Sequence, residues 1–299
     1  MLDAKIDTLL MVYETRNFTR AAKQLSLTQP AVSHHINQLE KELGVKIFNR
    51  SKNDLKPTFE GKIVIMYAKR IKSLYNKLQQ ELIDSKNQIT QITIGITHTA
   101  ESNFMVEVLA KYCSINDGVN IKIITAPIKK LYNMLMNYEI DLAIVEGTVS
   151  NMDINSLLID TDYLVLAVSN NNELAKKNMV TIDQLKKEKM ILRLPGSGTR
   201  NLFIAHLESI NMSIREFNLI LEVDNVGTIK DLVSQDFGIS ILPRSVCLDY
   251  VKNGKLTILP IENLSMIRET NILYHKDFSH MNILQNITKL YNKTAKIYK

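Results

Sequence analysis

The stretch FTRAAKQLSLTQPAVSHHINQLEKELGVKIFNR (Phe18–Arg50) decides the architecture at the amino-terminal end of this 299-residue chain. The small pair Ala21-Ala22 predicts a helix that packs closely on its neighbours. After a short break at Ser26–Thr28, a second helix begins at Gln29-Pro30, because proline suits a first helical turn, where its missing N–H has no partner to lose. Two helices joined by so short a break are typical of a helix-turn-helix.

The second helix of this pair has an apolar and a polar face. Val32 and Ile36 recur at helical spacing, so we expect them to pack inward. The polar face carries side chains that donate or accept hydrogen bonds at base edges and phosphates. The candidate DNA contacts on this helix and its cap are Thr28, Gln29, Pro30, Ser33, His34 and Asn37.

A basic turn follows the two helices. The segment 49–57, NRSKNDLKP, predicts an exposed hairpin after a short strand at Val45–Phe48. Such a hairpin would lie beside the duplex as a wing, and its candidate contacts are Arg50, Lys52 and Lys56. Residues 1–88 hold 15 Lys and Arg against nine Asp and Glu, whereas residues 89–299 hold 22 of each. The net charge of +6 is therefore in the first third, as expected for a segment that binds a polyanion.

From about Thr58 to about Lys86 the pattern predicts one long helix. At about 1.5 Å per residue it would span roughly 40 Å, which is too long for burial within one small domain. Its narrow apolar stripe predicts pairing with another helix; packing on the carboxyl-terminal domain is the alternative. The stripe consists of Ile71, Leu74, Tyr75, Leu78 and Leu82.

From residue 89 the pattern changes to strands that alternate with helices, which predicts an α/β architecture with largely parallel sheets. We expect two lobes with a cleft between them. Lobe I would comprise residues 89–161 and 268–299, and lobe II residues 162–267. The predicted strands are Ile92–Ile96, Val119–Ile124, Asp141–Val145, Tyr163–Val168, Met190–Leu194, Leu219–Val223, Ile239–Leu242 and Asn271–Tyr274.

Polar residues follow several of these strands, and ligands of open α/β sheets bind at the carboxyl ends of strands. In PGSGTR (Pro195–Arg200) the backbone amides, the hydroxyls and the guanidinium suit a carboxylate or another oxyanion. An ordinary strand-to-helix turn capped by Ser or Thr explains this segment equally well. Glu146 would repel anions or select a cationic group, so the charge of the ligand stays open. The candidate ligand contacts are Thr97, His98, Thr99, Glu146, Ser197, Gly198, Thr199, Arg200 and Asn225.

Other classes of protein fit the sequence poorly. No apolar run approaches the roughly 18 residues of a membrane span, and the amino terminus lacks the apolar core of a signal peptide. Cys113 and Cys247 lie far apart without metal-site spacing, so we expect two buried thiols and no disulfide. No metalloprotease, hydrolase or Walker motif occurs. We therefore expect a soluble cytoplasmic protein that is not an enzyme and has no catalytic residues, metal or cofactor.

One set of residues in the first 61 positions recurs at family-specific spacing. It comprises Ala21-Ala22, Leu25, Gln29-Pro30-Ala31-Val32-Ser33, Ile36, Leu39-Glu40, Leu43-Gly44, Phe48-x-Arg50 and Thr58-x-x-Gly61. This pattern resembles the LysR-type transcriptional regulators. The chain departs from the family at His34, where arginine is usual, and at Pro57, where leucine is common. A neutral imidazole at position 34 would weaken a phosphate or guanine contact and make binding sensitive to pH.

The resemblance implies a multi-domain α/β protein. Residues 1–62 would form a winged helix-turn-helix, residues 63–88 a linker and dimerisation helix, and residues 89–299 a two-lobed effector domain like a periplasmic binding protein. The expected partners are double-stranded promoter DNA, a small anionic metabolite in the inter-lobe cleft, a second copy of the chain in a homodimer or homotetramer, and RNA polymerase. The resemblance further implies base contacts for Gln29 and Pro30, phosphate or mixed contacts for Thr28, Ser33 and His34, and a minor-groove contact for Arg50.

Two alternatives stay open at this point. The chain would be a ligand-binding or enzymatic α/β protein if its amino-terminal helices served only for oligomerisation, and its DNA binding would then be weak and independent of sequence. It would be an architectural DNA-binding protein if the sensor were vestigial, and no metabolite would then stabilise it.

Overall fold

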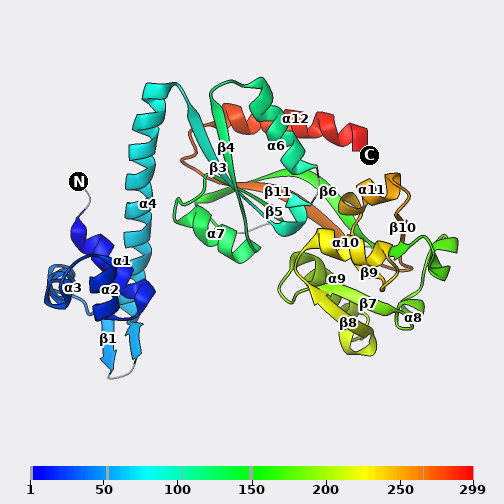
Figure 1. Cartoon of the computed structure of the whole chain (residues 1–299), viewed down its shortest axis with the longest axis horizontal. Helices are drawn as coiled ribbons and strands as arrows, with labels where there is room; N and C mark the ends of the chain where they lie inside the picture. The colour runs from blue at the N-terminus through cyan, green and yellow to red at the C-terminus, as the bar shows by residue number, and fades with distance from the viewer. Residues whose placement is uncertain (1–2, 52–53, 103, 148–150, 265, 299) are drawn as a thin grey trace. The chain divides into compact units, whose positions relative to one another are not determined.

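The computed structural model describes residues 3–51, 54–102, 104–147, 151–264 and 266–298, without the side chains at positions 50, 51, 54, 297 and 298. The chain forms two compact units. One comprises residues 1–90 and the short segment 136–139, and the other comprises residues 91–135 and 140–299. Figure 1 colours the helices and the hairpin of the first unit blue to cyan.

The first unit consists, in its described residues, of four helices and one hairpin around a single apolar cluster. Ala21, Ala22, Val32 and Ile36 are all buried in this cluster, as predicted. The elements are α1 (Ala4–Thr15), α2 (Phe18–Gln24), α3 (Gln29–Leu43), β1 (Phe48–Ser51), β2 (Asp54–Pro57) and α4 (Phe59–Asn87).

Single residues set the ends of these helices. The side chain of Asn17 accepts a hydrogen bond from the N–H of Arg20 and begins α2, and Thr28 does the same for α3. Gly44 ends α3 with φ +67°, a left-handed conformation that glycine adopts without strain. The predicted start of α3 at Gln29 is confirmed.

The predicted strand Val45–Phe48 is wrong, because β1 begins only at Phe48. The N–H of Val45 bonds to the carbonyl of Glu40, and the N–H of Ile47 bonds to the carboxylate of the same residue. These bonds tie the segment to the end of α3 instead of to a second strand.

The second unit contains a large mixed sheet and a separate two-stranded sheet. Among the described residues, seven strands join in the order β10-β6-β11-β5-β3-β4, with β9 also on β6, and β7 pairs with β8. The strands are β3 (Thr90–Ile96), β4 (Val119–Thr125), β5 (Leu142–Glu146), β6 (Ile154–Ser169), β7 (Lys189–Arg193), β8 (Asn218–Val223), β9 (Ser240–Pro243), β10 (Leu256–Leu259) and β11 (Ile267–His275).

Helices separate most of these strands, as Figure 1 shows. The α-helices are α5 (His98–Glu101), α6 (Met105–Ile115), α7 (Ile128–Met136), α8 (Ile182–Leu185), α9 (Gly198–Ser209), α10 (Val226–Ser234), α11 (Arg244–Lys252) and α12 (Met281–Tyr298). Two short 3₁₀-helices are η1 (Glu173–Lys176) and η2 (Ile214–Glu216).

The prediction of largely parallel sheets is wrong. β3 pairs in parallel with β5, and β7 pairs in parallel with β8. β11, however, is antiparallel to both β5 and β6. β6 is also antiparallel to β9 and β10. β6 also begins nine residues before the predicted Tyr163, and β10 was not predicted. The polar start of β6, which includes Asn155, Ser156 and Asp160, hid the strand, because it lacks an apolar run and is recognised only through its pairing with β11.

Apolar clusters lie on both sides of the point where β6 and β11 cross from one part of this unit to the other. Ile159 and Ile272 belong to the cluster with β3, α6 and α12, whereas Leu164 and Met266 belong to the cluster with β7 and α9. We call these two parts the β3 lobe and the β7 lobe. The predicted lobe boundaries at residues 162 and 267 stay predictions.

The two cysteines are free thiols. Cys247 is buried, as predicted, and burial raises the pKa of its thiol to about 12. Cys113 is only half-buried, so the prediction of two buried thiols holds for Cys247 alone.

Candidate functional site

Helix α3 presents a polar face to solvent. The amide Nε2 of Gln29 donates to Oγ of Ser33 at 2.9 Å, which aligns two hydrogen-bonding side chains on adjacent turns. His35 turns toward α1, where its Nδ1 lies 2.8 Å from Oγ1 of Thr8, and its neighbour His34 is exposed. Thr28, Gln29, Pro30 and Asn37 are exposed as well, and Ser33 is half-buried. This face can dock in a groove of duplex DNA.

Buried Glu40 connects α3 to the hairpin β1–β2, which we call the wing. Its carboxylate accepts hydrogen bonds from the Ile47 N–H at 2.9 Å, the Phe48 N–H at 3.4 Å and Nζ of Lys46 at 2.7 Å. Burial by itself raises the pKa of Glu40, but these donors together hold it below its ordinary value. The role of Glu40 as the acceptor at the base of the wing was not predicted from the sequence, although Glu40 continues the inward face of Val32 and Ile36 at four-residue spacing.

The Thr58-x-x-Gly61 motif fixes the other side of the wing. Oγ1 of Thr58 accepts from the Gly61 N–H at 2.8 Å and begins α4, while its own hydroxyl donates to the carbonyl of Lys46. A Cβ at Gly61 would collide with the carbonyl of Ile47. The motif therefore serves packing between α4 and the base of the wing.

Lys56 is exposed on β2 of the wing, and Arg50 lies on β1 opposite Leu55. The side chain of Arg50 and the whole of Lys52 lie outside the described residues.

The predicted apolar stripe of α4 is largely exposed. Ile71 and Leu74 are each 45% exposed, Leu78 53% and Leu82 58%, and Tyr75 is half-buried. The same helix exposes Phe59, Ile63, Met66 and Tyr67. An apolar surface of this length is typical of a helix that pairs with a partner.

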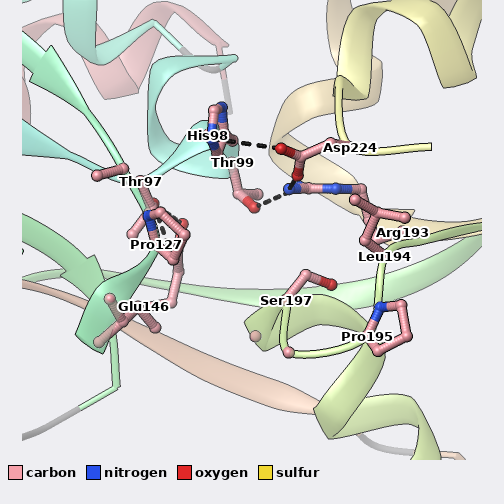
Figure 2. A pocket seen from close by; sticks show the side chains of 14 residues that line it. Thr97, His98, Thr99, Pro127, Glu146, Arg193, Leu194, Pro195, Ser197 and Asp224 are labelled. Carbon is pink, nitrogen blue, oxygen red and sulfur yellow. Dashed lines mark hydrogen bonds and ion pairs between the residues drawn. The ribbon is translucent and has the colours of Figure 1, made fainter. Parts of the chain in front are cut away.

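The second unit contains a cavity of about 220 Å³ between its β3 and β7 lobes (Figure 2). The β3 lobe contributes residues at the ends of β3 and β5 and at the start of α7, and the β7 lobe contributes the end of β7, the start of α9 and the turn after β8. The lining comprises Thr97, His98, Thr99, Ala126, Pro127, Ile128, Glu146, Arg193, Leu194, Pro195, Gly196, Ser197, Gly198 and Asp224.

A polar cluster joins the two lobes on one side of this cavity. Arg193 donates from one guanidinium nitrogen to Oγ1 of Thr99 at 3.2 Å and from the other to Oδ1 of Asp224 at 3.0 Å. Nε2 of His98 lies 3.7 Å from the other oxygen of Asp224. Figure 2 shows these four side chains together, with Ser197 and Glu146 facing the cavity from other directions. Arg193 is 4% exposed, and its buried Nε has no hydrogen-bond partner in the part of the chain that the structure describes.

Six of the nine predicted ligand contacts line the cavity: Thr97, His98, Thr99, Glu146, Ser197 and Gly198. The other three are absent from the described lining. Arg200 is buried against Glu222 and the carbonyl of Arg193, and the side chain of Asn225 caps α10. The hydroxyl of Thr199 is buried and has no hydrogen-bond partner among the described residues.

Arg193 and Asp224 were not among the ligand contacts predicted from the sequence. Each left a signal in the sequence. Arg193 is the single charge in the apolar run MILRL, and Asp224 follows β8 directly before the predicted Asn225.

Two family models match the chain. Residues 4–62 match the helix-turn-helix model of bacterial regulatory proteins of the lysR family, and residues 86–290 match the LysR substrate binding domain. The chain belongs to the LysR family of transcriptional regulators. Both the predicted family and the predicted fold class are thereby confirmed.

Curated relatives of this LysR-type regulator align over most of its length. It is 30% identical over 272 residues to the uncharacterized HTH-type transcriptional regulator MJ0300 of Methanocaldococcus jannaschii, covering 89% of this chain and 91% of that protein. It is 27% identical over 270 residues to the HTH-type transcriptional regulator CysL of Bacillus subtilis, covering 90% and 89%.

Full-length CbnR complexed with its target DNA has the same fold, with a TM-score of 0.69 at 16% identity over 98% of this chain and 100% of that chain. No helix in the described part of this regulator is long and apolar enough to cross a membrane.

Proposed function

We propose that this LysR-type regulator binds promoter DNA through the polar face of α3 and the wing, and that a small metabolite in the cavity changes this binding. The cavity carries the proposal, because residues of both lobes line it and the Arg193–Thr99 hydrogen bond joins the two lobes on one side of it. A ligand that interacts differently with two arrangements of the lobes shifts the equilibrium between them.

On the DNA side, Gln29 and Pro30 contact bases in the major groove, and Thr28, Ser33, His34 and Asn37 contact bases or phosphates. Arg50, Lys52 and Lys56 bind the backbone or the minor groove beside the wing. With the exception of half-buried Ser33, the described side chains of this set are exposed, which supports the assignment. The positive charge of the first 88 residues supplies the electrostatic attraction.

On the ligand side, Arg193 and the amides that begin α9 bind an anionic group, with Thr97, His98, Thr99, Ser197 and Gly198 around it. The regulatory domain of CcmR from Synechocystis was solved in complex with 2-PG; it has a TM-score of 0.59 and 22% identity over 68% of this chain and 97% of that chain. That neighbour supports a small anionic metabolite as the class of ligand.

The exposed stripe of α4 forms the dimer contact, and dimers associate into tetramers. The assembled regulator acts on DNA in the cytoplasm, where RNA polymerase is its further partner. We assign the winged domain to residues 1–62, the linker helix to 63–88 and the effector domain to 89–299, with lobe I in 89–161 and 268–299 and lobe II in 162–267.

Fluorescence anisotropy with the DNA upstream of its own gene tests the proposal. We expect binding that survives competitor DNA at physiological salt, and Gln29→Ala to weaken it at least about tenfold because the amide that reads a base edge is removed. A metabolite that raises the melting temperature of the full chain must also change this affinity. Weak binding that is independent of sequence would instead favour the helices as an oligomerisation device.

A further inference from the structure

We infer that the ligand of the cavity is a zwitterion, whose ammonium group binds Glu146 and whose anionic group binds Arg193. The inference rests on the proposed function and deepens it, because it names the class of compound that the cavity selects. Three observations carry it: the charge balance around Glu146, the unused hydrogen-bonding capacity of its carboxylate, and the unpaired Nε of Arg193.

The buried acids behind the cavity outnumber their cations. Among the described residues, Arg268 is the cation within ion-pair range of both Glu146, at 3.6 Å, and Asp162, at 3.9 Å. The three side chains are at most 10% exposed, so solvent screens their charges poorly. Two carboxylates that share one guanidinium leave one negative charge uncompensated, and Glu146 is the member of this group that lines the cavity.

The carboxylate of Glu146 keeps acceptor capacity. Its two oxygens lie 2.9 and 2.8 Å from Oγ1 of Thr97, but this hydroxyl has a single proton to donate. Arg268 is too far from Glu146 for a hydrogen bond. An ammonium group in the cavity would supply both the missing positive charge and the missing donors.

The opposite wall offers a site for an anion. Nε of Arg193 is a buried donor to which the described residues offer no acceptor, and an unmade bond of this kind favours an incoming acceptor. The first amides of the twelve-residue helix α9, at Gly198 and Thr199, begin the helix beside the cavity and add its positive dipole end. The carboxylate of Asp224 already pairs with Arg193 and lies near His98, so it does not need a cationic group of the ligand to compensate its charge.

The cavity volume limits the ligand to a small molecule. An amino acid or a small amino-phosphate carries both groups within that volume. A plain dicarboxylate would instead place a second negative charge against Glu146.

Matched ligand pairs test the inference by calorimetry on the full-length chain. Each pair has the same carbon skeleton with either an ammonium or a hydroxyl group: L-serine and glycerate, L-aspartate and L-malate, and O-phosphoserine and 3-phosphoglycerate. We expect at least one ammonium member to bind and to exceed its hydroxyl partner by about tenfold or more.

Two variants separate ligand selection from structure. Glu146→Gln keeps the size of the side chain and removes its charge, so we expect it to abolish the preference within the pair. Glu222→Gln makes the same change at a carboxylate outside the described lining and serves as the matched control, because we expect the preference to survive. Circular dichroism melts verify that both variants fold.

Equal or tighter binding of the hydroxyl member, or a preference that persists in Glu146→Gln, would overturn the zwitterion and leave the effector cavity standing. Failure of every member of the panel to bind would also overturn it. Sequence-specific DNA binding, measured on the same preparation, tests the proposed function separately.

Discussion

Glu40 in the winged unit and Glu146 in the cavity are both buried carboxylates, yet their surroundings differ. Glu40 receives two backbone amides and the ammonium group of Lys46, all within 3.4 Å. The two oxygens of Glu146 share the single hydroxyl proton of Thr97, and the guanidinium of Arg268 lies 3.6 Å away. The hydrogen bonds at the base of the wing are therefore complete without a ligand, whereas the cavity retains unused capacity to bind one.

The largest effect on stability is expected at Gly61, where α4 packs against the base of the wing. A methyl group there collides with the backbone carbonyl of Ile47, so Gly61→Ala should lower the free energy of unfolding of the winged unit by about 3 kcal/mol. Gly44→Ala is the matched control: its Cβ meets open space, and its positive φ costs about 1 kcal/mol. Hydrogen exchange of the amides in α4 and the wing measures the difference. Equal effects would contradict close packing at Gly61.

Glu40→Ala should cost about 2 kcal/mol, because the amides of Ile47 and Phe48 lose their acceptor inside the fold. Glu40→Gln keeps an acceptor oxygen and should lose less. Urea unfolding at neutral pH compares the two variants. A glutamine that is as damaging as alanine would show that the charge, and not the hydrogen bonds, positions the wing.

Glu40 also predicts a pH dependence. Its pKa in the folded chain is lower than its ordinary value of 4.5, so its stabilisation is complete above that value and is lost as the pH falls through the folded pKa. Urea midpoints between neutral pH and pH 3 should therefore fall more steeply for wild type than for Glu40→Gln. Parallel profiles would contradict the assigned cause.

In the cavity, Arg193→Gln should weaken ligand binding at least about tenfold, because it removes a charged donor. Arg200→Gln should leave the affinity within about twofold and reduce stability, since Arg200 contacts Glu222 and a backbone carbonyl. Calorimetry with the compound that stabilises the chain most in a thermal-shift panel distinguishes the two. A large loss of affinity for Arg200→Gln would restore the contact predicted from the sequence.

The smallest expected effect concerns Arg50. Arg50→Ala should weaken DNA binding and reduce the log–log salt slope by about 0.9 for each phosphate that the variant no longer neutralises. Lys86→Ala, at the far end of α4, is the matched control. An unchanged affinity and slope for Arg50→Ala would remove Arg50 from the interface.

Much of the winged unit was predictable because its signals are local. Asn17, Thr28 and Gly44 set helix ends through bonds within four residues, and the inward spacing of Val32 and Ile36 needs only the helical period. The cavity was predictable only in part. The expectation that ligands bind at the ends of strands predicted Thr97 to Thr99 and Ser197 correctly. It did not predict which of the nearby polar side chains are already bonded to other residues.

The sequence by itself determined the family, the helix-turn-helix and the alternation of strands and helices, because short-range spacing and capping specify them. Only the tertiary structure decided the antiparallel course of β6 and β11 and the composition of the cavity. Arg193 donates a hydrogen bond to Thr99, which lies 94 positions away in the sequence. Arg200, at the start of the next helix, bonds to Glu222 and is absent from the described lining of the cavity. Such choices depend on which buried partners the fold brings together, and no local pattern encodes them.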